Sequence, residues 1–209
     1  MMKVKIVSIC ILLLVGCSTT KLVSTWKNPD IVLFDAYKVL VVGMTQDENV
    51  QQIFETRLQE ALSAKGVEAM RSIDVFDVEF TSSEKSEEEL SAVEQQLLDK
   101  GFDAILFTKI IGTENRRTFK EKMNNISEMY TRFSADYLEH QDIYYNPEYY
   151  ETFNIYRAET SLYCICVDKE RELIWRGNID VTEPVNMEKT IDSYIKLIKS
   201  KMGEEEVIF

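Results

Sequence analysis

Two cysteines in the last third of the chain are the clearest candidates for chemistry. Cys164 and Cys166 form a C-x-C pair on a predicted strand, where side-chain alternation places both thiols on one face. A zinc site would need further cysteine or histidine ligands, and no second cluster in the sequence supplies them. Extended backbone sets next-but-one side chains roughly 6.5 Å apart, which suits a disulfide poorly, although a distorted strand in an oxidising compartment would permit one. We therefore expect two buried core thiols.

The single histidine is the other candidate for chemistry. His140 lies between Glu139 and Asp142, which could suggest an acid–base dyad, but no nucleophile motif such as G-x-S-x-G accompanies it. A phospholipase-D-type lipid synthase would need two histidines, and Gly43 after the first predicted strand lacks the G-x-G-x-x-G spacing of a phosphate loop. We therefore expect an isolated exposed histidine, no bound metal or cofactor, and a protein that is not an enzyme.

The charge composition argues against one class of binding partner. The 209 residues include 24 basic and 36 acidic side chains, so the formal net charge is −12. Nucleic-acid binding needs a basic face that releases counterions, and the charge therefore argues against nucleic acid. Hydrophobic residues make up 45% of the chain, which is enough for the core of one ordinary domain.

The amino terminus has the pattern of a bacterial secretion signal. Lys3 and Lys5 precede an apolar run that is far shorter than the roughly twenty residues needed to cross a membrane as a helix. Leu14-Val15-Gly16-Cys17 resembles the lipobox of bacterial lipoproteins, in which the cysteine receives diacylglycerol. The resemblance implies cleavage after residue 16 and a mature chain that is anchored to a membrane by acyl chains, such as palmitate, on Cys17.

Alternating strand and helix patterns predict the fold of the mature chain. The runs 38–43, 67–71 and 102–111 are apolar or β-branched and predict strands. Helices are predicted between them, one from a capping box at Thr45-Glu48 to Gly66 and one from a capping box at Ser86-Glu89 to Gly101. This order predicts parallel strands that are joined by right-handed crossovers.

The end of the chain follows a different pattern. Ile155–Val167 and Glu172–Val181 flank a polar turn and predict a β-hairpin, and apolar residues at helical spacing predict a closing helix that stops at Gly203. The sequence thus predicts a single α/β domain with a mixed sheet. The predicted organisation is a signal peptide at 1–16, a lipidated tether at 17–36, the α/β domain at 37–203 with an insert at 112–152, and a tail at 204–209.

The insert at 112–152 holds six of the ten tyrosines. Apolar residues from Phe119 to Tyr137 recur at a heptad-like spacing that is typical of one helix. This stripe could pack back onto the domain's own sheet, or it could contact a partner, because aromatic residues, methionine and arginine are favoured at interfaces. The aromatic cluster at 144–150 could instead line a ligand cleft between the sheet and the insert. The candidate partner or ligand contacts are Phe119, Met123, Tyr130, Phe133, Tyr137, Tyr144, Tyr145, Tyr149 and Tyr150.

Several segments together resemble a widespread family of small, uncharacterised bacterial envelope lipoproteins. The lipobox is followed by Ser24-Thr25-Trp26-Lys27-Asn28-Pro29, by strands at 38–42 and 101–106, and by Leu173-Ile174-Trp175-Arg176-Gly177. The strand–helix order is also similar to the sandwich domains of the penicillin-binding-protein activator lipoproteins and to the amino-terminal domain of the translocation protein TolB. These resemblances imply a binding module rather than an enzyme.

Two functions therefore follow as expectations. The first is a lipid-anchored, periplasm-facing envelope protein that acts as a non-catalytic binding or scaffold module and contacts another envelope protein through the insert. The second is a protein that binds a wall fragment, a glycan or a lipid in the tyrosine-lined cleft. Ser18 follows Cys17 in place of the aspartate that retains enterobacterial lipoproteins in the inner membrane, and this favours the outer membrane.

Overall fold

A computed structural model describes most of the chain from Thr20 onward. The described residues are 20–81, 83–113, 132–146, 148–149, 155–165, 172–181 and 186–208. Cys17, Cys166 and the candidate contacts Phe119, Met123, Tyr130 and Tyr150 lie outside these ranges. None of the helices in the described ranges is long and apolar enough to cross a membrane.

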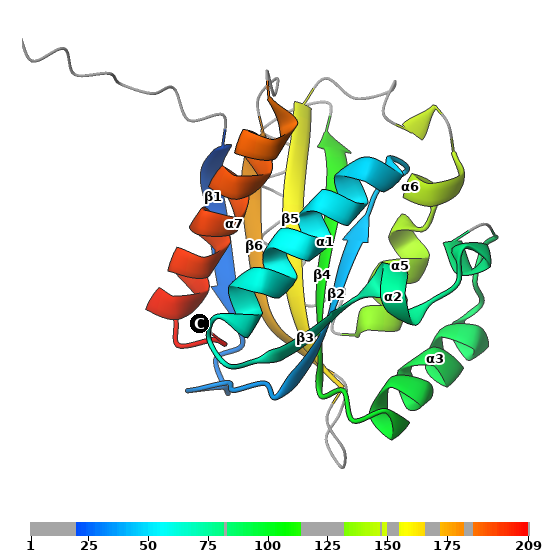
Figure 1. Cartoon of the computed structure of the whole chain (residues 1–209), viewed down its shortest axis with the longest axis horizontal. Helices are drawn as coiled ribbons and strands as arrows, with labels where there is room; N and C mark the ends of the chain where they lie inside the picture. Colours follow the sequence, from blue (N-terminus) through cyan, green and yellow to red (C-terminus); the bar gives the residue numbers. More distant parts are fainter. Residues whose placement is uncertain are drawn as a thin grey trace, which may run out of the picture.

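Six strands form one mixed sheet in the spatial order β1-β6-β5-β4-β2-β3 (Figure 1). The strands β4, β2 and β3, of which β3 forms one edge of the sheet, are parallel, and β5 and β6 form an antiparallel hairpin. The predicted α/β fold with a mixed sheet is therefore confirmed. The strands are β1 (Thr20–Lys27), β2 (Lys38–Met44), β3 (Glu68–Arg71), β4 (Ala104–Thr113), β5 (Ile155–Cys164) and β6 (Leu173–Val181).

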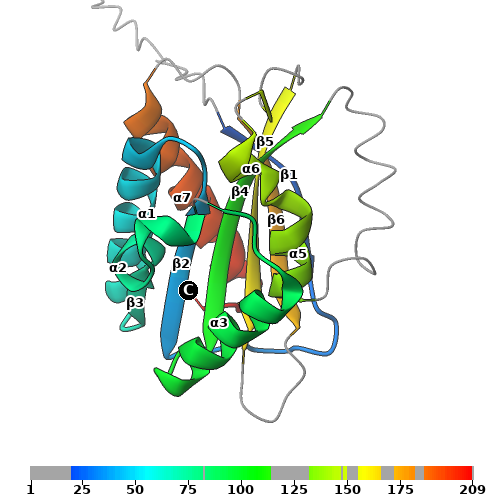
Figure 2. The ribbon, with the colours of Figure 1, turned by 90° about the vertical axis from the view of Figure 1, so that its right-hand side faces the viewer.

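Helices cover both faces of this sheet. α1 and α7 lie on one face, and α3, α5 and α6 lie on the other (Figure 2). The helices are α1 (Glu48–Ser63), α2 (Ser72–Val75), the 3-10 helix η1 (Val78–Thr81), α3 (Glu87–Asp99), α5 (Phe133–His140), α6 (Asp142–Tyr145) and α7 (Met187–Glu204).

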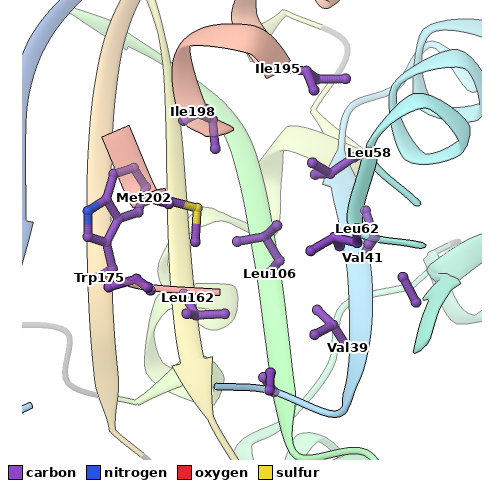
Figure 3. Packing of buried hydrophobic residues seen from close by; sticks show 14 of the residues in the cluster. Val39, Val41, Leu58, Leu62, Leu106, Leu162, Trp175, Ile195, Ile198 and Met202 are labelled. Carbon is purple, nitrogen blue, oxygen red and sulfur yellow. The ribbon is translucent and has the colours of Figure 1, made fainter. Parts of the chain in front are cut away.

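Side-chain alternation along the strands divides the core into two layers. Leu106 and Leu162 point toward α1 and α7, where they meet side chains such as Leu58 and Ile198 (Figure 3). The neighbouring strand positions belong to the second layer, which includes Phe107 and packs against α3, α5 and α6. The second layer is the one that contains the candidate site.

The edge strand β1 contradicts the predicted tether at 17–36. Thr20 pairs with Val181 and Lys27 pairs with Trp175, so residues 20–27 belong to the sheet of the folded domain. A bulge between Leu22 and Ser24 shifts the register, and as a result the strand does not show the simple alternation that would have revealed it.

The end signals of α3 and the glycine stop after α1 are confirmed, whereas the predicted start of α1 and the predicted stop at Gly203 are wrong. Ser86 and Glu89 form the predicted capping box at the start of α3. Gly66 and Gly101 follow α1 and α3 with φ angles of +84° and +80°, as the predicted left-handed stops require. The predicted box at Thr45 is wrong, because the helix starts later.

The observed cap of α1 is Asp47. Its carboxylate accepts hydrogen bonds from the backbone N–H groups of Asn49 and Val50, both at 3.0 Å. An aspartate in this position satisfies two of the four free N–H groups at the start of the helix. The closing helix α7 also differs slightly from the prediction, since it continues through Gly203 to Glu204.

Gly177 leaves room for the buried indole of Trp175 two residues earlier on β6. A Cβ atom added to Gly177 would lie 2.2 Å from the indole Cη2 atom. We expect Gly177→Ala to lower the free energy of unfolding by roughly 1–3 kcal/mol, because the ring must leave its packed position. Urea unfolding followed by circular dichroism would measure the loss.

The same substitution in a Trp175→Leu background provides the control. Without the indole, the added methyl group has space, so the cost of Gly177→Ala should be much smaller there. An equal cost in both backgrounds would show that the indole is not the cause.

Candidate functional site

The second half of the predicted insert forms the helices α5 and α6. The N-cap of α5, Arg132, has an extended backbone with φ −125° and ψ 142°, so the predicted stripe does not continue through it as a single helix. Phe133 and Tyr137 are only 5% and 2% exposed. They pack against the domain's own sheet, which is one of the two alternatives left open by the sequence, and they do not form an exposed surface for a protein partner.

A cavity of about 320 Å³ lies beside β2, between α1, α2, η1, α3 and α5. Leu40 and Val42 of β2 form its floor, and Val93 and Leu97 of α3 close one side. The cavity adjoins the carboxyl ends of two parallel strands, because α1 follows β2 and α2 follows β3. In open α/β sheets, ligands bind in crevices of this kind.

Five aromatic side chains form the wall of the cavity. The rings of Phe76 and Phe80 are stacked with centroids 4.7 Å apart, and Phe80 lies 6.2 Å from Tyr137. Tyr137 in turn lies 5.9 Å from Phe133 and 6.3 Å from Tyr144. These separations are those of interacting aromatic pairs, so the wall is one connected cluster that combines residues from the end of α2, η1, α5 and α6.

Tyr137 contributes a buried hydroxyl group to this wall. The Tyr145 hydroxyl group is close enough to interact with it, but the two groups do not form a hydrogen bond of ordinary length. Burial raises the pKa of Tyr137 strongly, and the nearby phenols of Tyr144 and Tyr145 raise it further. The hydroxyl is therefore neutral, and a molecule in the cavity could give it a hydrogen-bond partner.

Polar side chains surround the aromatic wall. Glu48, Gln51 and Gln52 come from the first turns of α1, and Asp77 lies next to η1. No lysine, arginine or histidine contributes to the described lining. The cavity thus has apolar walls, a few amide and hydroxyl groups, and two carboxylates at its exposed rim.

Glu55 supports the polar side of the cavity from behind. Its buried carboxylate accepts hydrogen bonds from the Gly43 N–H at 2.8 Å, the Ser72 hydroxyl at 2.6 Å and the Ile73 N–H at 3.3 Å. Burial raises its pKa above the ordinary value, although these hydrogen bonds act in the opposite direction. The carboxylate joins the ends of β2 and β3 through α1, so it holds the rim in place.

A buried cluster of charged side chains lies behind α5. The Lys109 ammonium group donates to Asp136 Oδ1 at 2.6 Å and to Glu159 Oε1 at 2.7 Å, and all three side chains are almost fully buried. Lys109 and Glu159 are directly opposite each other on β4 and β5, whereas Asp136 belongs to α5. The contacts therefore join α5 to the sheet.

Arg176 and Tyr163 complete the charged cluster. The Tyr163 hydroxyl donates to Asp136 Oδ2 at 2.5 Å, and Arg176 lies 3.5 Å from Glu159 and 3.8 Å from Asp136. Burial raises the pKa of Asp136 and Glu159, but the charges of Lys109 and Arg176, and for Asp136 also the contact with His140, outweigh it, so both pKa values lie below their ordinary range. The two carboxylates are thus ionised and paired, which suits positioning rather than proton transfer.

His140 belongs to this cluster and is not an isolated exposed residue, so that prediction is wrong. Its Nδ1 atom lies 3.1 Å from Asp136 Oδ1, and its side chain is 18% exposed. The i,i+4 spacing on α5 brings the two residues together. In the described part of the chain, no group of three or more histidine, cysteine, aspartate or glutamate side chains could hold a metal ion.

The remaining candidates from the sequence are distributed as follows. Tyr144 lines the cavity, whereas the Tyr145 hydroxyl donates to the Ser83 carbonyl and Tyr149 packs against the second core layer. The predicted cleft of four tyrosines is therefore represented by one of them, with Tyr150 outside the described residues. Cys164 is buried and disulfide-bonded, so the expectation of a free core thiol is wrong for this residue.

The sequence contained a signal for the charged cluster. Lys109 interrupts the longest apolar strand, and Glu159 and Arg176 likewise occupy strand positions between buried residues. Lysine, glutamate and arginine are almost never fully buried unless they are paired. The charges on three different strands therefore pointed to a paired cluster, but they did not reveal Asp136 as the partner from α5.

Comparisons with known proteins identify no family for this chain. No family model matches it, and no curated protein matches it. Among solved structures, the PelC dodecamer from Paraburkholderia phytofirmans has a TM-score of 0.42 and 8% identity, over 90% of this chain and 98% of that chain. A variant PelC dodecamer from the same organism has a TM-score of 0.38 and 9% identity, over 87% of this chain and 96% of that chain. The class of this protein therefore follows from its fold, which is a single α/β domain with a mixed sheet.

Proposed function

We propose that the protein is a lipid-anchored envelope protein whose α/β domain binds a small ligand in the aromatic cavity. The observation that carries the proposal is the cavity itself, with a volume of about 320 Å³ and an aromatic wall that includes Tyr137. Ligand sites in proteins are typically apolar concave surfaces of this size with a few polar groups that fix orientation. Wall fragments, glycans and lipids are the candidate ligand classes.

The proposed anchor would determine which end of the domain faces the membrane. Thr20 begins β1 only three residues after Cys17, a span of at most about 11 Å in an extended chain. The start of β1 lies beside the end of β6, and the parallel strands β2 and β4 end at the same side of the sheet. In the proposed arrangement, the rim formed by the first turns of α1 therefore lies close to the bilayer.

Contact between the insert and another envelope protein remains a second proposal. A crosslinking test of that contact should delete only residues 114–131. Removing the whole insert would also remove Asp136, Phe133 and Tyr137, which belong to the buried core. The shorter deletion leaves these core contacts in place.

Blocking the cavity tests the ligand proposal. Gln52 is an exposed residue at the rim, so we expect Gln52→Trp to fill the entrance without disturbing the core. A panel of wall fragments, oligosaccharides and phospholipids would be screened by thermal shift, and the affinity of each hit would be measured by calorimetry. The substitution should weaken the binding of a true ligand at least tenfold.

Gln95→Trp is the matched control. Gln95 is also an exposed glutamine on a helix, but it does not line the cavity. Its replacement should leave the affinity unchanged. Hits that bind both variants equally well would place their site elsewhere on the protein, and a panel without any hit would count against the ligand proposal.

A further inference from the structure

We infer that the aromatic cavity binds organic cations, either amines or quaternary ammonium groups with an apolar body, in preference to anions. The inference rests on the proposed function and specifies the chemical class of its ligand. It depends on three features of the cavity: the charges of its lining, the aromatic wall, and the buried hydroxyl group of Tyr137.

All charged side chains in the described lining of the cavity are acidic. Glu48 and Asp77 are exposed residues at the rim, and the lining contains no basic side chain. The ammonium group of Lys85 lies 5.2 Å from the ring centroid of Phe80, but Lys85 does not line the cavity. With a net charge of −12, the chain as a whole also attracts cations and repels anions.

The amino terminus of α1 does not reverse this preference. A helix amino terminus attracts anions through its free N–H groups and its dipole. Here the carboxylate of Asp47 already accepts from the N–H groups of Asn49 and Val50, and Glu48 adds a second negative charge in the first turn. A phosphate or carboxylate ligand at this end would face two acids.

The aromatic wall suits a cation with an apolar body. Aromatic faces attract ammonium groups within about 6 Å of the ring centroid, and the attraction grows when the site is shielded from water. The wall presents Phe76, Phe80, Phe133, Tyr137 and Tyr144 within one connected cluster. The same rings can pack against the apolar part of the ligand.

The hydroxyl group of Tyr137 provides a polar contact in the interior. Tyr137 is 2% exposed, and its hydroxyl group interacts with the Tyr145 hydroxyl without forming a hydrogen bond of ordinary length. Its oxygen can accept a hydrogen bond from an amine, or donate one to a hydroxyl group of the ligand. The burial of this hydroxyl group is an observation independent of the acids at the rim.

Pairs of molecules that differ mainly in charge test the inference. Choline would be compared with its neutral isostere 3,3-dimethyl-1-butanol, and phenethylammonium with phenethyl alcohol, by calorimetry on the full folded domain. In at least one pair the cation should bind about tenfold more tightly than its neutral partner. Asp77→Asn and Glu48→Gln should each weaken the cation several-fold, and added salt should reduce that difference because it screens the exposed carboxylates.

The controls separate this inference from the proposed function. If the neutral molecules bind as tightly as the cations, and Gln52→Trp removes both, the cavity is a ligand site but the preference for cations is overturned. The same conclusion follows if neither pair binds while a glycan, wall fragment or lipid binds in a manner sensitive to Gln52→Trp. If no compound binds in either screen, both the inference and the proposed function fail.

Discussion

Replacing Asp136 by asparagine is expected to lower the free energy of unfolding by about 3–5 kcal/mol, which is the typical cost of removing one partner from a buried ion pair. Asp136 is fully buried, and it accepts from the Lys109 ammonium group and the Tyr163 hydroxyl. In the variant, Lys109 and Arg176 share Glu159 as their remaining buried anion in the described cluster. The NH₂ group of the new asparagine would also face one of the two donors, the Lys109 ammonium group or the Tyr163 hydroxyl. Urea unfolding near pH 7, followed by tryptophan fluorescence, would measure the loss.

An exposed ion pair provides the control for this substitution. Glu68 lies 2.9 Å from Lys38, but its side chain is 62% exposed. Exposed pairs of this kind contribute about 0–1 kcal/mol, so Glu68→Gln should change stability little. A loss below about 1 kcal/mol for Asp136→Asn would mean that the buried cluster does not hold α5 to the sheet, since it falls well short of the usual cost.

The pH dependence of unfolding should change in a defined direction. The folded-state pKa values of Asp136 and Glu159 lie below those of unfolded carboxyl groups, which are about 4. Their contribution to stability is therefore complete above that pH and is lost as the pH falls below it. Asp136→Asn removes one of these groups, so the variant should lose stability less steeply than the wild type between about pH 5 and pH 3. The raised pKa of Glu55 makes stability change with pH in the opposite direction. This effect is present in both proteins, so it cancels in the comparison.

Replacing Cys17 by alanine is expected to abolish lipidation. The proposed lipobox places the acyl acceptor at this thiol, and alanine has no group that can carry the lipid. Metabolic labelling with a palmitate analogue, followed by immunoprecipitation, would measure the acyl chains. Cys10→Ala is the matched control, because Cys10 lies inside the proposed signal peptide and should not affect labelling. Persistent labelling of the Cys17→Ala protein would contradict the proposed anchor.

A second version of the chain tests whether the lipid holds the domain at the membrane. Exchanging residues 1–17 for an ordinary cleavable secretory signal should release the domain from the membrane fraction almost completely. A single acyl chain binds a bilayer with an association constant of about 10⁴ M⁻¹, and several chains on one residue bind far more firmly. Retention of the exchanged protein in the membrane fraction would point to another attachment.

The sequence by itself determined the features that depend on residues close together in the chain. The capping box at Ser86, the stops at Gly66 and Gly101, the parallel strands and the hairpin were all predicted and are present. Each of them follows from local periodicity, from the conformational freedom of glycine, or from connection rules that hold for most α/β proteins.

Only the tertiary structure decided how distant segments combine. β1, near the start of the chain, pairs with β6, near its end, and its bulge hides the alternation that would mark a strand. The cavity gathers side chains from α1, α2, η1, α3, α5 and α6, and Asp136 meets Lys109 and Glu159 only because α5 packs on that face of the sheet. Local patterns specify which face of an element is apolar. The partner of a buried charge or ring depends on which elements pack together, and that choice is made by the burial and hydrogen bonding of the whole domain.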